Sequence, residues 1–297
     1  MNTVSCSKPT LLDRVIETIG ELPTSPNVVS AIMGLTSDLN TEITKLSRVL
    51  SADQALTAKV LRLSNSPFYG RVRGVGSLDE AIMILGFFTI RSLVVASSAY
   101  SMFNKGNDNS YEGRLWAHSL ATAMCARITA RRVGIKQIEE VFLAGLLHDI
   151  GILILLKKMR KDYSGVIKEV NKSGCDLVEV EQNLLGFSHP ELGALILDRW
   201  NFPPILSHSV REHHDPAVPE SLDDLADEDR DMAIAAHIVC FADELSKSLG
   251  HALEENYQAR LAEMPSVHFL HLAPENIADI ATEVEERFAE EQQLFES

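Results

Sequence analysis

Cysteine is scarce in this sequence, and the cysteines that are present lie far apart. Four occur in 297 residues, none of them in a CxxC pair: Cys6, Cys125, Cys175 and Cys240. A thiolate zinc site or a disulfide framework needs cysteines at characteristic spacings. The spacing therefore argues against both kinds of site, and we expect reduced thiols in the core or on the surface.

Positive charge is also scarce. The chain has 27 Lys and Arg residues against 42 Asp and Glu residues, for a formal net charge of −15. DNA, RNA and acidic lipid bind basic surfaces. We therefore expect neither nucleic acid nor membrane as a partner, whereas a nucleotide or another phosphate-containing small molecule would need local cations.

Long apolar runs and targeting signals are missing as well. No apolar stretch reaches the roughly 18 to 20 residues that cross a bilayer. The N-terminus, MNTVSCSKPTLLDRV, lacks a basic segment followed by a hydrophobic core. With 45% hydrophobic residues, the sequence is typical of a globular protein with one large domain or two ordinary ones. We expect it to be cytoplasmic.

No run of residues alternates as a strand does, and helical periodicity dominates. The spacing predicts a buried helix over about 88–100, after a capping-box pair at Ser77 and Glu80. Further helices are predicted at about 112–132, 138–147, 160–173, 176–185, 189–200, 204–214 and 230–249. The fold class is therefore all-α.

The polar stretch Asn104–Ser110 is the best candidate boundary between two helical lobes. We predict lobes over 12–104 and 110–250, followed by an acidic helical tail over 251–297. Residues 215–229, rich in Asp, Glu and Pro, are expected to form a solvated loop. One face of the tail is apolar and could either dock on its own domain or contact a second subunit, which would make a homodimer: Ile277, Ile280, Val284 and Phe288.

The segment GLLHDIG, residues 145–151, places His148 and Asp149 at the end of an apolar run that predicts a buried helix. A buried carboxylate is costly unless it is paired, neutralised or bound to a metal. Other inward-facing imidazoles and a second carboxylate occur on the predicted helices: His118, His189, His213, His214 and Asp243.

Seven such side chains are more than one metal ion needs, since about three or four protein ligands suffice. Mixed nitrogen and oxygen donors suit iron, manganese or zinc, and the set suits two ions with one carboxylate as a bridge. Such a centre can activate water for phosphoryl displacement, which makes His148 and Asp149 the candidate catalytic residues. Taken singly, however, an inward-facing histidine is more often a hydrogen-bonded core residue than a metal ligand. The remaining histidines are predicted to be surface or packing residues: His208, His237, His251, His268 and His271.

The order of these residues resembles that of the HD superfamily of metal-dependent phosphohydrolases. Four segments narrow the resemblance to the HDOD family: LPTSP (22–26), LRLSNSPFYG (61–70), SLDEAIMILG (77–86) and FLAGLLHDIG (142–151). The resemblance covers roughly residues 12–250. It implies an all-helical protein that acts as a regulatory or output module in bacterial signalling.

The resemblance also implies a division of the ligands between two metals. His118, His148, Asp149 and Asp243 would hold one ion. Asp149, as the bridge, would hold the second together with His189, His213 and His214.

The chain departs from the related HD-GYP branch, which hydrolyses cyclic dinucleotides. After His213-His214 it reads Asp215-Pro216-Ala217-Val218-Pro219, without the Gly-Tyr-Pro segment of that branch, and Ile152 stands where active HD enzymes commonly have a phosphate-binding lysine. A basic stretch over 157–161 is nearby in sequence.

Three functions remain open. The leading hypothesis is a signalling module that retains a metal centre and binds signalling proteins or a phosphate-containing molecule. The alternatives are an active metal-dependent phosphohydrolase and a non-catalytic interaction scaffold.

Overall fold

A computed structural model of the chain describes residues 10–18, 26–37, 41–66, 74–103, 110–253, 257 and 261–296. The described residues form helices joined by turns and loops and contain no strand, which confirms the all-α class. The elements run in this order: α1 (Leu11–Thr18), α2 (Pro26–Ser37), α3 (Ile43–Ser51), α4 (Gln54–Ser64), α5 (Leu78–Phe103), α6 (Tyr111–Val133), α7 (Ile138–Leu147), α8 (Ile150–Lys158), α9 (Arg160–Ser173), α10 (Leu177–Leu185), α11 (His189–Arg199), α12 (Pro204–Glu212), α13 (Asp227–Ser246), the π-helical segment η2 (Lys247–His251), the 3₁₀ turn η3 (Leu261–Glu263), α14 (Pro265–Phe269) and α15 (Pro274–Glu296).

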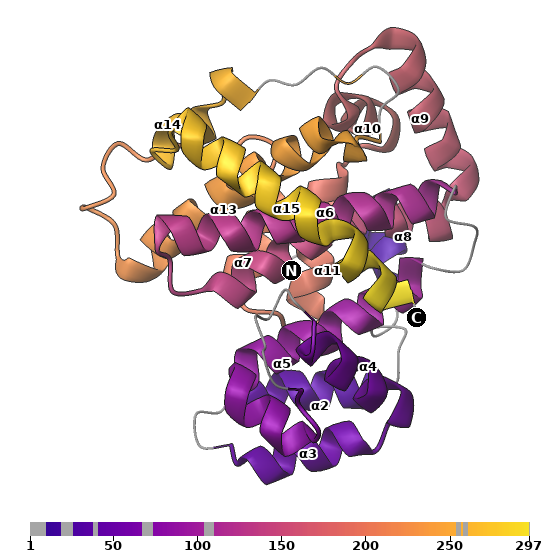
Figure 1. Cartoon of the computed structure of the whole chain (residues 1–297). Helices are drawn as coiled ribbons and strands as arrows, with labels where there is room; N and C mark the ends of the chain where they lie inside the picture. The colour runs from indigo at the N-terminus through magenta and orange to yellow at the C-terminus, as the bar shows by residue number, and fades with distance from the viewer. Residues whose placement is uncertain are drawn as a thin grey trace, which may run out of the picture.

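The helices form two lobes (Figure 1). Helices α2, α3 and α4 pack against α5 in the smaller lobe, and α6, α7, α11, α12 and α13 pack together in the larger one. Helix α1 lies against α11 of the larger lobe, where Arg199 donates a hydrogen bond to the carbonyl of Ile16. Lys158, at the end of α8, donates to the carbonyl of Thr18. The residue boundaries that we predicted for the lobes stay predictions.

Helix α5 is the apolar centre of the smaller lobe. Its segment Leu78–Met102 has the length and hydropathy of a membrane-crossing helix, contrary to our expectation from the sequence. However, 61% of its most apolar window is buried inside the protein. Gly86, with φ 81° and ψ 165°, also breaks the helix two residues before the buried helix that the sequence predicts over 88–100. We therefore interpret α5 as a core helix.

Ion pairs with buried arginines lie where α5 meets the larger lobe. Arg91 of α5 pairs with Glu140 of α7, and Ser92 donates a hydrogen bond to the carbonyl of Glu139. Arg127 of α6 pairs with the side chain of Glu139. Because both guanidinium groups are almost completely buried, these pairs hold α7 in one position relative to its neighbours.

The C-terminal helix α15 crosses α6 and reaches α4 and α5 (Figure 1). Ile280 and Val284 of its apolar face are buried, and Phe295 packs edge-on against Trp116 with ring centroids 5.4 Å apart. The apolar face of the tail is thus docked on its own chain, as in the first of our two expectations. A homodimer stays a prediction.

The downstream helices begin and end close to the positions that the periodicity predicts, and capping residues explain several of these positions. Ser110 accepts a hydrogen bond from the amide of Gly113 at the start of α6, and left-handed Gly134 follows its end. Helix α8 was not predicted, because residues 150–156 are apolar and buried on every face and show no periodicity. Helix α13 begins at Asp227, slightly before the end of the predicted loop.

Three sequence features lie wholly or largely outside the described residues: Leu22–Pro26, the end of the 61–70 segment, and the Asn104–Ser110 boundary. Cys6 lies outside them too. Of the other cysteines, Cys125 and Cys240 are buried and Cys175 is exposed, all of them as free thiols. This agrees with the expectation of reduced thiols.

Candidate metal centre

The seven side chains selected from the sequence converge from separate helices of the larger lobe. His118 lies on α6 and Asp243 on α13, His148 and Asp149 form the junction of α7 and α8, His189 begins α11, and His213 and His214 follow α12. All are buried except His214, which is exposed. We call this set the His/Asp cluster.

One half of the His/Asp cluster lies between α6, α7 and α13. Nε2 of His118 lies 3.1 Å from Nε2 of His148 and 3.1 Å from Oδ1 of Asp243. Nε2 of His148 lies 3.3 Å from Oδ2 of Asp149. These four residues offer nitrogen and oxygen atoms close enough to share one ion.

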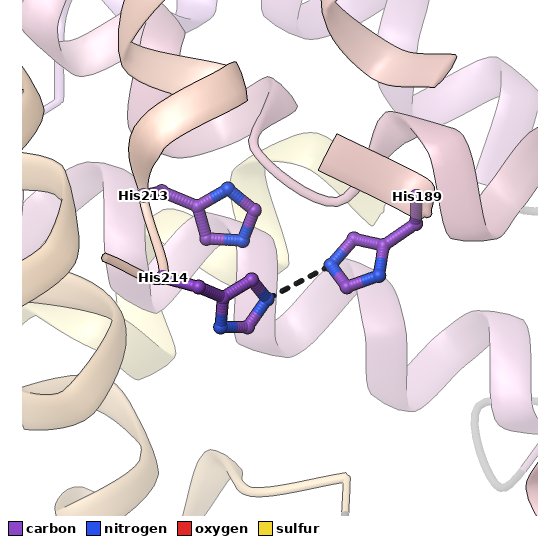
Figure 2. Close-up of side chains that lie close together, drawn as sticks. All are labelled: His189, His213 and His214. Carbon is purple, nitrogen blue, oxygen red and sulfur yellow. Dashed lines mark hydrogen bonds between the residues drawn. The ribbon is translucent and has the colours of Figure 1, made fainter. Parts of the chain in front are cut away.

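The other half lies where α11 and α12 meet. His189, His213 and His214 face one another, with Nε2 of His214 3.0 Å from Nε2 of His189 (Figure 2). The rings of His213 and His214 lie with their centroids 4.1 Å apart. Ligand atoms of these three residues all lie within 4.8 Å of one another.

Asp149 lies between the two halves and presents a different oxygen to each. Its Oδ2 faces Nε2 of His148 at 3.3 Å and Nε2 of His118 at 3.6 Å. Its Oδ1 faces Nε2 of His189 at 3.2 Å and Nε2 of His213 at 3.8 Å. A carboxylate in this position can bridge two cations.

Hydrogen bonds at Nδ1 orient three of the rings. Nδ1 of His148 donates to the carbonyl of Gly145 at 2.8 Å, and Nδ1 of His213 donates to the carbonyl of Val210 at 2.7 Å. For His118 the partner is the hydroxyl of Ser246, whose single proton is donated to the carbonyl of Asp243. Nδ1 of His118 must therefore be the donor, which leaves Nε2 with its lone pair.

A carboxylate orients His189. Oε2 of Glu181 accepts from both the backbone amide and Nδ1 of His189, each at 2.7 Å. Oε1 of Glu181 accepts from the hydroxyl of Tyr163 at 2.7 Å. Metal-binding histidines commonly have such a partner, because it sets the tautomer and makes the other ring nitrogen a better ligand.

The lone pairs that result have no complementary donor in the His/Asp cluster. Nε2 of His118 and Nε2 of His148 face each other although both rings carry their proton on Nδ1. Among the described residues, Nε2 of His213 and Oδ1 of Asp243 are buried without a hydrogen-bond partner. Because orphaned buried polar atoms are costly, this donor set fits divalent metal binding.

The pKa values of several groups in the His/Asp cluster are shifted by burial and by neighbouring charges. Burial by itself raises the pKa of Asp149, but His148 and His189 hold that pKa well below its ordinary value. Burial, assisted by His148, lowers the pKa of His213 to about 3. Burial opposes the charged form of His189, yet Glu181 and Asp149 raise its pKa to about 10. In the metal-free protein His189 is therefore protonated, and its positive charge stands beside Asp149 where a metal ion would otherwise bind.

Both glycines of the GLLHDIG segment allow close backbone approach. A Cβ atom on Gly151 would lie 2.1 Å from the backbone oxygen of His189. A Cβ atom on Gly145 would lie 3.1 Å from Cα of Ala123 and from the carbonyl oxygen of Thr122, both in α6. The glycines thus bring the His-Asp pair close to the helices that carry His118 and His189.

Sequence reasoning missed two charged residues at the cluster. Glu181 belongs to a different helix from His189, so only the fold brings them together. Lys247 forms an ion pair with Asp243 four residues earlier, a helical spacing that could have indicated it.

Two cations of the basic stretch over 157–161 have partners away from the cluster, and the position noted for a phosphate-binding lysine holds an isoleucine. Ile152 is buried in the apolar core, Lys158 donates to the carbonyl of Thr18, and Arg160 pairs with Glu112. The five histidines predicted to be surface or packing residues lie outside the cluster. Of these, His237 is buried and stacked on Phe269.

Comparison with known proteins agrees with the resemblance found in the sequence. The HDOD domain model matches residues 22–216, which is more than half of the chain, so the protein belongs to the HDOD family. An HDOD domain protein from Geobacter sulfurreducens has a similar structure, with a TM-score of 0.76 and 27% identity over 97% of this chain and 96% of that one. A candidate phosphohydrolase from Shewanella amazonensis shares the fold, with a TM-score of 0.72 and 24% identity over 96% of this chain and 97% of that one.

Similarity to curated sequences is more limited. Ribonuclease Y of Sulfurovum sp. is 26% identical over 168 residues, which are 57% of this chain and 25% of the ribonuclease. The chain spans less than half the length of the curated relatives that it matches.

Proposed function

We propose that this HDOD protein is a bacterial signalling or regulatory module with a retained dinuclear metal centre at the His/Asp cluster. The observation that carries the proposal is the position of Asp149, whose two oxygens face separate groups of imidazoles at 3.2 to 3.8 Å. His118, His148, Asp149 and Asp243 would hold one ion, and Asp149, His189, His213 and His214 the other. Iron, manganese and zinc suit these donors.

The proposal includes a regulatory role, in which the module binds a signalling protein or a phosphate-containing molecule in the cytoplasm. The lobes predicted at 12–104 and 110–250, with the tail at 251–297, would be its structural units. Two arginine–glutamate pairs position α7, which contacts α5 of the smaller lobe and ends at the His-Asp pair. A partner that moves α5 against α7 would therefore also act on His148 and Asp149.

Metal analysis tests the proposal directly. Protein purified without chelator should contain close to two equivalents of iron, manganese or zinc by elemental analysis. An Asp149→Ala variant should lose most of the metal and remain folded by circular dichroism. A wild-type metal content below about one equivalent would contradict a metal centre, whether it holds one ion or two.

A second candidate function is phosphoester hydrolysis. A carboxylate bridge between two adjacent cation positions is the arrangement that clamps an in-line phosphoryl displacement. The similarity to proteins named ribonuclease Y supports a phosphodiester substrate for this alternative. His148 and Asp149 would then be the essential residues.

The test of hydrolysis uses a generic substrate. Wild-type protein loaded with manganese or ferrous iron should hydrolyse bis(p-nitrophenyl) phosphate, and Asp149→Ala should abolish the turnover. Full metal loading without turnover, on this substrate and on a panel of nucleotides, would reject the enzyme and leave the regulatory module standing. Partner binding that survives Asp149→Ala without any metal would instead support a scaffold.

A further inference from the structure

His214 differs from the other imidazoles of the His/Asp cluster in how its ring is held. Nδ1 of each of the other four rings donates a hydrogen bond to a carbonyl, a hydroxyl or a carboxylate. Among the described residues, none forms a hydrogen bond with Nδ1 of His214, whose ring contacts those of His189 and His213. The position of this exposed ligand therefore depends on its backbone.

The backbone of His214 continues into a stiff segment. After α12 and the two histidines the chain reads Asp215-Pro216-Ala217-Val218-Pro219. Each proline fixes one of its own backbone dihedrals and restricts the residue before it. Ala217 follows three residues after His214 and is at most roughly 10 Å from it along the chain. A group that holds Ala217 therefore also restricts where His214 can lie.

His237 of α13 holds Ala217. Its Nε2 lies 3.3 Å from the carbonyl oxygen of Ala217 and must donate, because a carbonyl only accepts. Burial lowers the pKa of His237, so the ring is neutral at pH 7 and Nδ1 accepts from the hydroxyl of Ser266, 3.0 Å away. The ring also stacks on Phe269, with centroids 3.8 Å apart. One buried imidazole thus ties the segment after His214 to α13 and α14.

A second side chain of α13 holds the far end of the same loop. The loop comprises residues 215–226, which lead into α13, and we call it the strap. Arg230 donates from Nε to the carbonyl of Leu222 at 3.0 Å and from Nη2 to that of Leu225 at 3.4 Å. Arg230 and His237 are seven residues apart, about two turns, so they lie on one face of α13. The strap, which we expected to be a solvated loop, is therefore tethered at two places.

We propose that His237 is a positioning residue for the second metal position: it holds Ala217 and thereby the strap, and the strap fixes His214. The inference rests on the proposed metal centre and adds a residue that controls one of its two positions from outside the His/Asp cluster. Release of Ala217 should leave the group around His118 unchanged, since none of its four ligands lies on the strap or next to it in sequence.

The experiment makes two measurements on full-length protein. Hydrogen exchange with mass spectrometry, on metal-free protein, reports whether the strap is tethered. Titration with zinc in competition with a chelating dye reports the affinity of each metal position.

The variants separate the tether from general packing. His237→Phe keeps a ring to stack on Phe269 but removes both ring nitrogens, whereas His237→Gln restores a donor towards Ala217. Arg230→Met is the matched control, because it releases the strap only at its far end. Circular dichroism checks the folding of each variant. Ser266→Ala, which removes the partner that orients the His237 ring, replaces His237→Phe if that variant does not fold.

We expect His237→Phe to exchange faster in the strap and to bind zinc about three- to tenfold more weakly at the second position, because one ordinary hydrogen bond is lost. The affinity of the first position should not change. His237→Gln should lie close to wild type in both measurements. Arg230→Met should exchange faster near Leu222 and keep both zinc affinities. In a His214→Ala background, His237→Phe should weaken zinc binding no further, because its effect passes through His214.

Several outcomes would overturn the inference. Unchanged exchange in the strap of His237→Phe would show that the tether is absent, and faster exchange with wild-type zinc affinity would show that the strap does not position His214. Equal weakening at both metal positions, or a further loss in the His214→Ala background, would assign His237 to the general packing of α13. A wild type that binds no zinc would reject the proposed function and this inference with it, whereas the other outcomes concern His237 alone.

Discussion

Gly151 lies so close to His189 that no larger residue fits without moving the backbone. A Cβ atom at Gly151 would meet the backbone oxygen of His189 at 2.1 Å and its carbonyl carbon at 2.9 Å. This contact packs the start of α8 against the start of α11. It therefore sets the separation between Asp149 and His189, on which the two-sided arrangement of the cluster depends.

Replacing Gly151 by Ala should accordingly destabilise the protein and weaken metal binding. We expect the free energy of unfolding to fall by about 1–3 kcal/mol, as in other overpacked cores, and Asp149 to move away from His189. Urea unfolding and metal titration check the two effects. The control is Gly165→Ala in α9, where nothing lies within 4 Å of the new methyl group. That exposed helical position should gain up to about 1 kcal/mol, and equal stabilities for the two variants would contradict the prediction.

The two carboxylates of the cluster should differ in their effect on metal stoichiometry. Asp149→Ala removes an oxygen from both groups of imidazoles, so both metals should be lost. Asp243→Ala affects the group around His118 and His148 and should leave metal at His189, His213 and His214. Elemental analysis distinguishes the two outcomes. Asp198→Ala, at an exposed ion pair with Arg211, is the control and should retain wild-type metal content. Equal losses for Asp149→Ala and Asp243→Ala would argue against the bridge.

Glu181 should control the affinity of the second metal position. Glu181→Gln keeps the shape of the side chain but removes the charge that orients His189 and makes its ring a stronger ligand. We expect metal affinity there to fall by about 10- to 100-fold, as measured by competition with a chelating dye. Tyr163→Phe removes a single hydrogen bond to Glu181 and should have a smaller effect. A Glu181→Gln variant with wild-type affinity would show that His189 is not a ligand.

Metal binding should release protons and strengthen as the pH rises. In the metal-free protein Glu181 and Asp149 raise the pKa of His189 to about 10 against the effect of burial, and Asp149 also helps to raise the pKa of His148. His189 is therefore mainly protonated at pH 7 and must lose a proton to bind a metal. His213, with its pKa lowered to about 3 by burial, is already neutral.

The affinity should thus rise between pH 6 and 9, by up to about tenfold per pH unit for each proton displaced. Calorimetry in buffers of different ionisation enthalpy counts the protons. The raised pKa of His189 also increases the free energy of unfolding of the metal-free protein. This contribution is fully present below the ordinary pKa of histidine and is lost as the pH rises towards 10. Metal binding without proton release at pH 7 would contradict the assignment of His189 as a cation.

The seven candidate ligands could be selected from the sequence because local patterns indicate which side chains face inward. Apolar residues on every face of 141–147 indicated a buried helix, and a His-Asp pair at its end is costly without compensation. Helical spacing then placed His118, His213 and Asp243 on inward faces. The HDOD motifs indicated the family, which the family match confirms.

Periodicity failed where burial is complete. Helix α8 has no polar face, so no stripe marked it, and α5 had the apolar length of a membrane span although it is a core helix broken at Gly86. A pattern of polar and apolar residues reports which face is buried, but it does not report what covers that face.

The sequence by itself determined the all-helical class, the positions of most helices and the identity of the seven candidate ligands, since these depend on neighbours three or four residues away. The tertiary structure decided which oxygen of Asp149 faces which imidazole, that Glu181 supports His189, and that Lys247 pairs with Asp243 beside His118. These relationships join residues on different helices. Their distances depend on close packing such as that of Gly151 against His189, which no local pattern encodes.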